Sequence, residues 1–405
     1  PGQQEEKRTQ VTFKNIDVKY PDTRKDTTVV EDYHGTQIAD PYRWLEDPDA
    51  PTTEAWVREQ NKVTFDYLDQ IPYREEVRKR LEELWNYERY SPPSLHGEKY
   101  YYFRNDGLQN QDVLYVQESL EGEPGVVLDP NKFSEDGTVA LGGISFSADG
   151  RYLAYQVTEG GSDWHKARVL DLTTGETLDE ELEWLKFSSL SWAGNGFYYS
   201  RYPAPESGEK LSGVNEFHEV YYHRVGSPQS ADELVFSDRS NPRRGFFTST
   251  TDDERFLAVS VWETTSGNAL YFKDLSKEGA GFQAVVDELQ ADWSMVGNDG
   301  NRLYLLTNDE APNQRLLAVS AAQPEREYWE EIIPEGKDVL ENVEVIGGKL
   351  VAQYLHDATT QLKVFNLDGK FLGDVELPGL GVVSSISGKP DHPEAFFSFT
   401  SFIRP

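Results

Sequence analysis

The reactive side chains of this chain lack the spacing that catalysis needs. The chain has no cysteine, which excludes disulfides, thiolate nucleophiles and cysteine-based zinc or iron–sulfur sites. Its seven histidines, at positions 34, 96, 165, 218, 223, 356 and 392, form no metal-binding pattern, and even the closest pair, His218 and His223, matches neither a helix face nor a strand face. We therefore expect structural roles for the histidines, no metal and no cofactor.

A nucleophilic serine is also missing from its usual setting. Residues 160–164 read Gly-Gly-Ser-Asp-Trp, so a Gly-x-Ser-x-Gly elbow fails at its last glycine. No His-Glu-x-x-His motif, phosphate-binding loop or Gly-x-Gly-x-x-Gly pattern occurs. Acidic pairs such as Glu180-Glu181 and Glu330-Glu331 are typical of solvated edges. By itself, this polypeptide carries no complete catalytic constellation.

Composition narrows the class of protein and its partners. The 405 residues are 37% hydrophobic and 13% aromatic, and the aromatic share favours strands over a helical bundle. A net charge of −32 repels phosphate groups, so we expect neither nucleic acid nor anionic membranes as partners; the charge is typical of solubility or adaptation to high salt. No apolar run is long enough to span a membrane, and residues 1–8 lack the apolar core of a signal peptide. We expect a cytoplasmic protein, with the periplasm as the alternative.

One short unit recurs along most of the chain and must position whatever chemistry exists. In residues 147–155, an Asp-Gly turn leads directly into alternating aromatic and aliphatic residues, which predicts a hairpin turn entering a strand. Similar units are centred near Tyr101, Tyr198, Leu257, Leu303, Val351 and Phe397. In chain order, a second strand follows each of the first six of these seven units, and only the unit near Phe397 lacks one. Outer strands are predicted at residues 125–128, 233–236, 331–333 and 374–377.

The period of this unit predicts a β-propeller. Repeats of about 45–50 residues are typical of propeller blades, and one small sheet cannot bury both of its faces alone. We predict a mainly β fold, with seven blades over residues 91–405. The seventh blade is incomplete, because the sequence stops at Pro405 soon after the strand near Phe397. An open propeller exposes a sheet edge, so we expect the chain to be a fragment or one piece of a nicked protein.

Residues 1–90 do not share the repeat. Residues 11–14 alternate like a short strand, and Pro51 suits the first turn of a helix in which Trp56, Val63 and Tyr67 share a face. A second helix after Pro72 carries an apolar stripe of Val77, Leu81, Leu84 and Trp85. Two amphipathic helices and one strand are too few for an independent core, so this arm needs another body to pack on.

The arm and several later segments resemble the prolyl oligopeptidase family. The arm contributes residues 20–21, 30–35 and 40–48, which include Asp-Tyr-His-Gly and Asp-Pro-Tyr-Arg-Trp-Leu-Glu-Asp-Pro. The propeller region contributes residues 107–116, 134–141, 161–164, 186–188 and 399–402. These segments occur in one order over essentially the whole chain.

The resemblance implies a serine endopeptidase that hydrolyses short peptides on the carboxyl side of proline. In this family a seven-bladed propeller gates access to an α/β-hydrolase lobe, which carries the serine, aspartate and histidine and packs against the N-terminal arm. That lobe lies beyond the end of this chain, so residues 1–90 are expected to belong with it. Short proline-containing peptides and this lobe are the expected partners, with a monomer when complete, while the chain alone is expected to be inactive.

The resemblance also implies where the propeller contacts the peptide. Phe187, in Lys186-Phe187-Ser188, matches a family position in an apolar subsite, and Thr265 is carried over as a further contact. The family's peptide-binding arginine is replaced here by Trp262, which has one donor and no charge. Either Arg243 or Arg244 substitutes, or the peptide is held by stacking, which is our hypothesis. The alternative for Phe187 is an ordinary core aromatic.

Two other functions are consistent with parts of the sequence. A non-catalytic propeller that serves as a binding platform explains the missing triad, but not the exposed blade edge or the arm. A hydrolase or lyase inside the propeller channel requires inward-facing histidine or acidic clusters, whereas the repeats carry aromatic and aliphatic residues.

Overall fold

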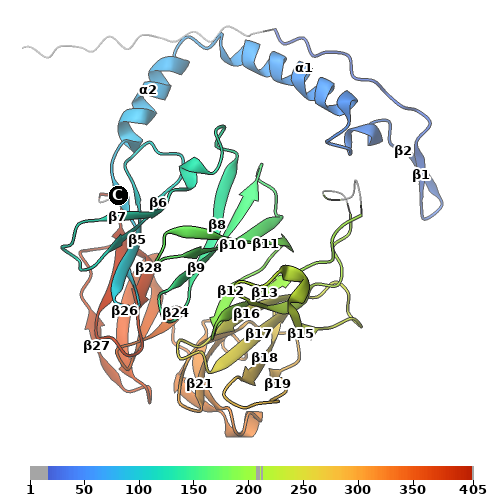
Figure 1. Cartoon of the computed structure of the whole chain (residues 1–405). Helices are drawn as coiled ribbons and strands as arrows, with labels where there is room; N and C mark the ends of the chain where they lie inside the picture. The colour runs from blue at the N-terminus through green and yellow to red at the C-terminus, as the bar shows by residue number, and fades with distance from the viewer. Residues whose placement is uncertain (1–16, 207–209, 211–212, 404–405) are drawn as a thin grey trace, which may run out of the picture. The chain divides into compact units, whose positions relative to one another are not determined.

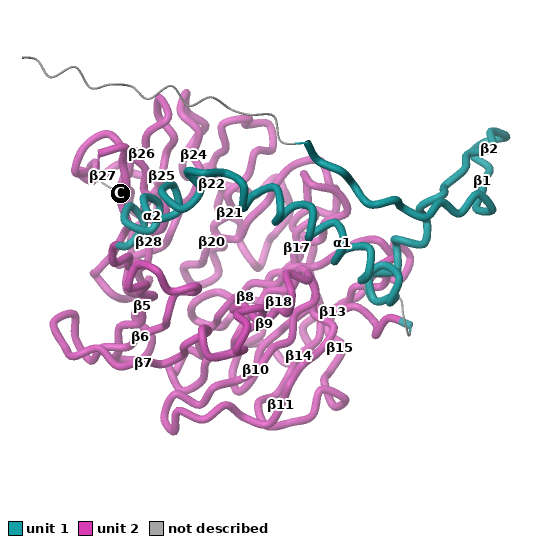
Figure 2. Tube along the Cα trace, turned by 90° about the horizontal axis from the view of Figure 1, so that it is seen from above, with its two compact units in different colours: residues 1–86, 206–213 teal, residues 87–205, 214–405 magenta. Residues whose placement is uncertain are grey.

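The structure is a computed structural model that describes residues 17–206, 210 and 213–403 (Figure 1). These residues form two compact units (Figure 2). Unit one holds the described residues of 1–86 and 206–213, and unit two holds those of 87–205 and 214–405. The strand predicted at residues 11–14 lies outside the described residues.

Unit one contains a hairpin that the sequence analysis did not predict. Strands β1 (Val30–Tyr33) and β2 (Thr36–Ala39) pair antiparallel around a two-residue turn. His34 and Gly35 at this turn have φ values of 55° and 89°. Positive φ at both central residues is typical of a type I′ two-residue hairpin turn, and glycine adopts it without strain.

Two helices complete unit one after a short 3₁₀ turn, η1 (Arg43–Leu45). Helix α1 (Pro51–Leu68) begins at the proline that predicted it, and α2 is Arg74–Trp85. The predicted apolar stripe of α2 is largely uncovered, because its four side chains are between 49% and 58% exposed. None of the helices described in the chain is long and apolar enough to cross a membrane.

Unit two consists of antiparallel sheets in chain order. Six have four or five strands: β3 (Arg89–Tyr90), β4 (Ser94–His96), β5 (Lys99–Asn105), β6 (Val113–Gln117) and β7 (Gly125–Leu128); β8 (Val139–Phe146), β9 (Tyr152–Glu159), β10 (His165–Asp171) and β11 (Glu176–Leu185); β12 (Leu190–Ala193), β13 (Gly196–Arg201), β14 (Glu219–Arg224) and β15 (Glu233–Ser237); β16 (Gly245–Thr250), β17 (Phe256–Trp262), β18 (Asn268–Asp274) and β19 (Gln283–Val286); β20 (Trp293–Asp299), β21 (Arg302–Thr307), β22 (Arg315–Ser320) and β23 (Glu330–Ile333); β24 (Val339–Ile346), β25 (Lys349–His356), β26 (Thr359–Asn366) and β27 (Phe371–Val375). The last sheet has two strands, β28 (Val382–Gly388) and β29 (Ala395–Thr400).

The recurring sequence unit is the turn that leads into β5 in the first sheet and into the second strand of each later large sheet. In the unit at residues 147–155, Ser147 Oγ donates to Asp149 Oδ1 over 2.6 Å, and the same oxygen accepts from the Arg151 backbone N–H over 3.0 Å. Gly150 takes a φ of 67°. The aspartate side chain therefore accepts the hydrogen bonds of the turn, and the glycine adopts the positive φ that the turn needs without strain. The outer strand predicted at 374–377 begins earlier, at Phe371, because the tight turn at Gly369 (φ 80°) returns the chain sooner.

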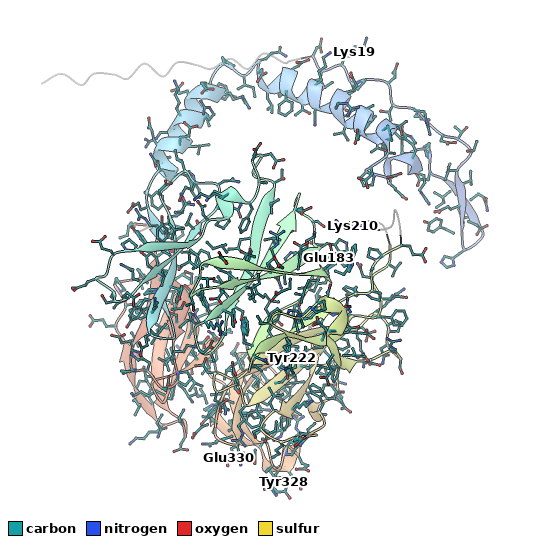
Figure 3. The ribbon with its side chains drawn as sticks, in the orientation of Figure 1. Lys19, Glu183, Lys210, Tyr222, Tyr328 and Glu330 are labelled. Atoms are coloured by element: carbon teal, nitrogen blue, oxygen red, sulfur yellow. The ribbon has the colours of Figure 1, made fainter. Side chains whose placement is uncertain are left out.

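Neighbouring sheets share their buried faces. In β9, Leu153 and Tyr155 face a cluster shared with the first sheet, whereas Ala154 faces a cluster shared with β12 and β13. Clusters of this kind join each successive pair among the six larger sheets. Figure 3 shows the side chains between the sheets, with Tyr222 among them. The predicted mainly β propeller is confirmed.

The two-stranded sheet lies between the sixth and the first of the larger sheets. On one side, the Val383 backbone N–H donates to Thr360 Oγ1 over 3.1 Å. On the other, Ser387 Oγ donates to the Pro93 carbonyl over 2.5 Å and Tyr100 Oη donates to Glu394 over 2.7 Å. Hydrogen bonds therefore join this sheet to both neighbours, and the rings of Tyr100 and Phe396 add an edge-to-face contact with centroids 6.0 Å apart.

We predict that removing one of these shared contacts is costly. Leu257 is fully buried between two sheets, so Leu257→Ala should lower the free energy of unfolding by about 2–5 kcal/mol. Leu372→Ala, at a side chain that is 50% exposed, should change it by less than about 0.5 kcal/mol. Urea unfolding followed by circular dichroism measures both, and equal effects would contradict cores that lie between sheets.

Candidate functional site

The strand order gives the propeller two different ends. In the first sheet β4 and β5 form a hairpin, and in each later large sheet the first two strands do. The turns of these hairpins lie on one end, the turn side, where several of them line one cavity. The other end, the connection side, carries the segments that lead from one sheet to the next. Phe187 lies between β11 and β12, Trp262 ends β17, and Thr265 follows in the turn to β18. All three predicted site residues therefore lie on the connection side.

Two of these three residues are in contact. The rings of Phe187 and Trp262 meet edge to face with centroids 5.8 Å apart. Phe247, on the innermost strand β16, stacks on Trp262 at 6.0 Å. We call Phe187, Phe247 and Trp262 the aromatic rim. Thr265 is exposed in its turn and lies outside these ring contacts.

Phe187 is exposed and its backbone is strained. The side chain is 46% exposed, so it is not an ordinary core aromatic. Its φ is 54°, in the left-handed region that bulky residues rarely adopt, and Trp184 nearby has a φ of 66°. Such a conformation costs on the order of 1–3 kcal/mol and persists where the surrounding structure imposes it, often at functional sites.

The Lys186 side chain contacts the ring of Phe187 in the aromatic rim. Its Nζ lies 5.5 Å from the Phe187 ring centroid and 5.3 Å from that of Trp164, and it pairs with Asp163 at 3.6 Å. The side chain is only 14% exposed, so the charge lies against the ring faces.

The hydrogen-bonding options at the rim are limited. Trp262 Nε1 is buried and has no acceptor within hydrogen-bond distance, so the indole offers its ring rather than its donor. Arg244 is engaged by Asp238 at 3.0 Å and Glu263 at 3.4 Å. Arg243 pairs with Glu216 at 3.8 Å and remains 78% exposed. Of the two arginines considered as substitutes, Arg243 is the less constrained.

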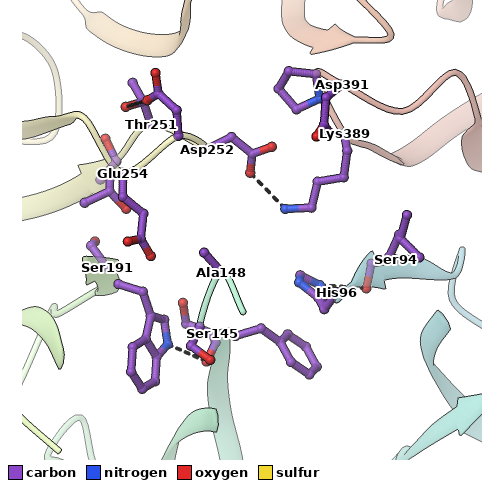
Figure 4. Close-up of a pocket in the computed structure, with 18 of the residues that line it drawn as sticks. Ser94, His96, Ser145, Ala148, Ser191, Thr251, Asp252, Glu254, Lys389 and Asp391 are labelled. Atoms are coloured by element: carbon purple, nitrogen blue, oxygen red, sulfur yellow. Dashed lines mark hydrogen bonds and ion pairs between the residues drawn. The ribbon is translucent and has the colours of Figure 1, made fainter. Parts of the chain in front are cut away.

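The turn side holds a cavity of about 1020 Å³ (Figure 4). Serine and threonine hydroxyls line much of it, and Ser191 and Thr248 join two inner strands through an Oγ–Oγ1 contact of 2.9 Å. His96 stacks on Phe146 with centroids 3.9 Å apart. Burial, aided by the positive charge of Lys389, lowers the pKa of His96 to about 3.

An ion pair crosses this cavity. Lys389, in the turn between β28 and β29, pairs with Asp252, in the turn between β16 and β17, at 2.8 Å. The two sheets are not neighbours in the ring, so the pair ties the two-stranded sheet to the opposite wall. Its side chains are 30% and 40% exposed, which makes the pair sensitive to salt.

The low pKa of His96 predicts a pH dependence of stability. An unfolded histidine gains a proton near pH 6.5, whereas the folded His96 stays neutral to about pH 3. The unfolded state therefore binds more protons between these limits, and stability falls as the pH falls through them. We predict a smaller loss of melting temperature between about pH 6.5 and 4 in His96→Phe than in the wild type; an equal loss would contradict this.

The ion pair predicts controlled access to the cavity. Because the chain has no cysteine, Ser145→Cys places a single thiol at the cavity wall. A small thiol reagent should label it several-fold faster when Lys389→Met is added, and faster in about 1 M salt, where the screening length is about 3 Å. Lys370→Met, at an exposed lysine elsewhere, is the matched control. Equal rates in all three backgrounds would contradict a bridge that restricts access.

Comparison with known proteins identifies the family. A family model described as the prolyl oligopeptidase N-terminal beta-propeller domain matches residues 21–405. The prolyl endopeptidase of Elizabethkingia meningoseptica is 43% identical over 397 residues, which are 98% of this chain and 56% of that protein. The chain thus spans about half the length of the curated relatives it matches.

Solved structures agree. A structure from a study of two prolyl endopeptidases, concerned with inter-domain dynamics in catalysis and specificity, is 36% identical with a TM-score of 0.74, covering 95% of this chain and 56% of that one. A mutant of prolyl oligopeptidase B from Galerina marginata, bound to a 25-residue macrocyclization substrate, is 27% identical with a TM-score of 0.84, covering 95% and 57%. The propeller described above is therefore that of a known peptidase group, and this chain belongs to the prolyl oligopeptidase family through its N-terminal β-propeller domain.

Proposed function

We propose that this chain is the substrate-gating part of a serine endopeptidase that cleaves short peptides after proline. The observation that carries the proposal is the 43% identity over 98% of the chain to a protein named prolyl endopeptidase. No Gly-x-Ser-x-Gly segment occurs in the sequence. The serine, aspartate and histidine are proposed to lie in a C-terminal α/β-hydrolase lobe, in the part of the relatives that this chain does not cover.

The aromatic rim is the proposed peptide contact of the propeller. Phe187 and Phe247 are 46% and 42% exposed, so their rings are available to an incoming peptide. Trp262 holds the two in place and contributes its ring face, since its Nε1 is buried. Covering these rings with a proline or an apolar side chain of the peptide is proposed to stabilise the complex by about 25 cal/mol for each square ångström of apolar surface. Thr265, in the turn that follows β17, is proposed to lie at the boundary of this subsite.

The two-stranded sheet is the proposed first half of a seventh blade. Its strand β29 carries the phenylalanines of the last repeat, and each larger sheet continues with two further strands after the corresponding one. A free sheet edge invites pairing, so strands from the continuing polypeptide are the proposed complement.

The exposed stripe of α2 gives the same lobe a docking surface. Val77, Leu81, Leu84 and Trp85 are each about half exposed, and relatives continue well past the matched region. Covering such a stripe stabilises by about 25 cal/mol for each square ångström of apolar surface. We propose that the C-terminal lobe covers it.

We propose that the propeller restricts access by size. The cavity on the turn side is bridged by Lys389 and Asp252, and a folded protein is proposed to be excluded from it. A peptide on the connection side is proposed to be enclosed with the catalytic groups, where exclusion of water strengthens the electrostatic interactions that stabilise the transition state.

A short chromogenic peptide that ends in proline tests the proposal. This chain alone should not cleave it, whereas the protein extended through its C-terminal lobe should. In the extended protein, Trp262→Ala should raise KM several-fold with little change in kcat, because the rim binds but does not react. Cleavage by this chain alone would refute the proposed division of labour, and an unchanged KM would refute the role of Trp262.

A further inference from the structure

On the connection side, the indole of Trp262 fills the space beside the backbone of Gly245. They face each other in the antiparallel pairing of β16 and β17. A Cβ atom at Gly245 would lie 2.1 Å from Trp262 Cζ2, 2.3 Å from Cε2 and 2.8 Å from Nε1. Real Cβ atoms do not approach other atoms this closely. The indole ring therefore occupies the volume that any side chain at position 245 would need.

The requirement for glycine here is one of space. The backbone of Gly245 is outside the left-handed region, so it does not need glycine for its conformation. The steric conflict falls instead on the indole, which is held by the rings of Phe187 and Phe247. A methyl group at position 245 would have to move the whole ring away from β16.

The position of the indole decides what the aromatic rim offers. Against Gly245, Trp262 buries its Nε1 and leaves Phe187 and Phe247 partly exposed. Displaced from β16, the ring would move into the space beside these two phenylalanines and expose its donor to water. The apolar surface that the aromatic rim exposes therefore depends on Gly245, which has no side chain.

We propose that Gly245 is a positioning residue that keeps Trp262 against β16 and so keeps open an apolar subsite for the side chain of a peptide substrate. The functional half of this inference rests on the function proposed above. The structural half does not, because the pose of the indole can be measured in this chain alone.

The indole pose has a direct spectroscopic readout. The chain has nine tryptophans, and the ¹⁵N–¹H indole resonance of Trp262 is the one lost in Trp262→Phe. In Gly245→Ala this resonance should shift, and its N–H should exchange faster with water because Nε1 becomes exposed. Gly143→Ala is the matched control, since it also lies on an innermost strand and a Cβ there meets nothing closer than 3.9 Å. An unchanged Trp262 resonance in Gly245→Ala overturns the inference.

A double-mutant cycle in the extended protein tests the effect on peptide binding. Gly245→Ala should raise KM several-fold at unchanged kcat, whereas adding it to Trp262→Ala should raise KM no further, because the ring it displaces is gone. If Gly245→Ala folds poorly, the double variant should recover folding for the same reason. Equal effects of Gly245→Ala with and without Trp262 overturn the inference.

Failure of the proposed function gives a different pattern. If Trp262→Ala leaves KM unchanged while Gly245→Ala still moves the indole resonance, the positioning of Trp262 by Gly245 is upheld and the peptide subsite is refuted. If Gly245→Ala alters the Trp262 resonance and raises KM only when Trp262 is present, both the positioning of Trp262 and the peptide subsite are supported.

Discussion

The whole of unit two depends on apolar faces that a single sheet cannot cover. Alternate residues of a strand point to opposite faces, so β9 sends Leu153 and Tyr155 to one neighbour and Ala154 to the other. Each core is shared by two sheets, and the sheets must follow one another around an axis. The ring, its channel and the difference between its two ends all result from this arrangement.

The two ends then acquire different chemistry. Hairpin turns gather on the turn side and bring carboxylates and hydroxyls to the cavity mouth, where Lys389 meets Asp252. On the connection side, Phe187, in the short segment between β11 and β12, contacts Trp262 at the end of β17. The aromatic rim is therefore built from three different parts of the chain: the segment before β12, strand β16 and the end of β17.

The sequence predicted the second and third strands of each larger sheet because they alternate and follow clear turns. It did not reveal the innermost strands. Strand β16 reads Gly-Phe-Phe-Thr-Ser-Thr and β8 contains two glycines, so neither has the regular alternation after an Asp-Gly turn that identified the other strands. Gly245 and Phe247 lie on such a strand and were not singled out, whereas Phe187 and Trp262 were named through resemblance, and their role in peptide binding stays a prediction. The seven-blade count remains a prediction, since six sheets have four or more strands.

The central claim is that the propeller binds and restricts substrate while the reacting serine lies elsewhere in the protein. A fluorophosphonate, which modifies only activated serines, tests this most directly when the modified residue is located by mass spectrometry in the protein extended through its C-terminal lobe. The account predicts one labelled serine beyond residue 405 and none within residues 1–405. A labelled serine inside this chain would contradict it.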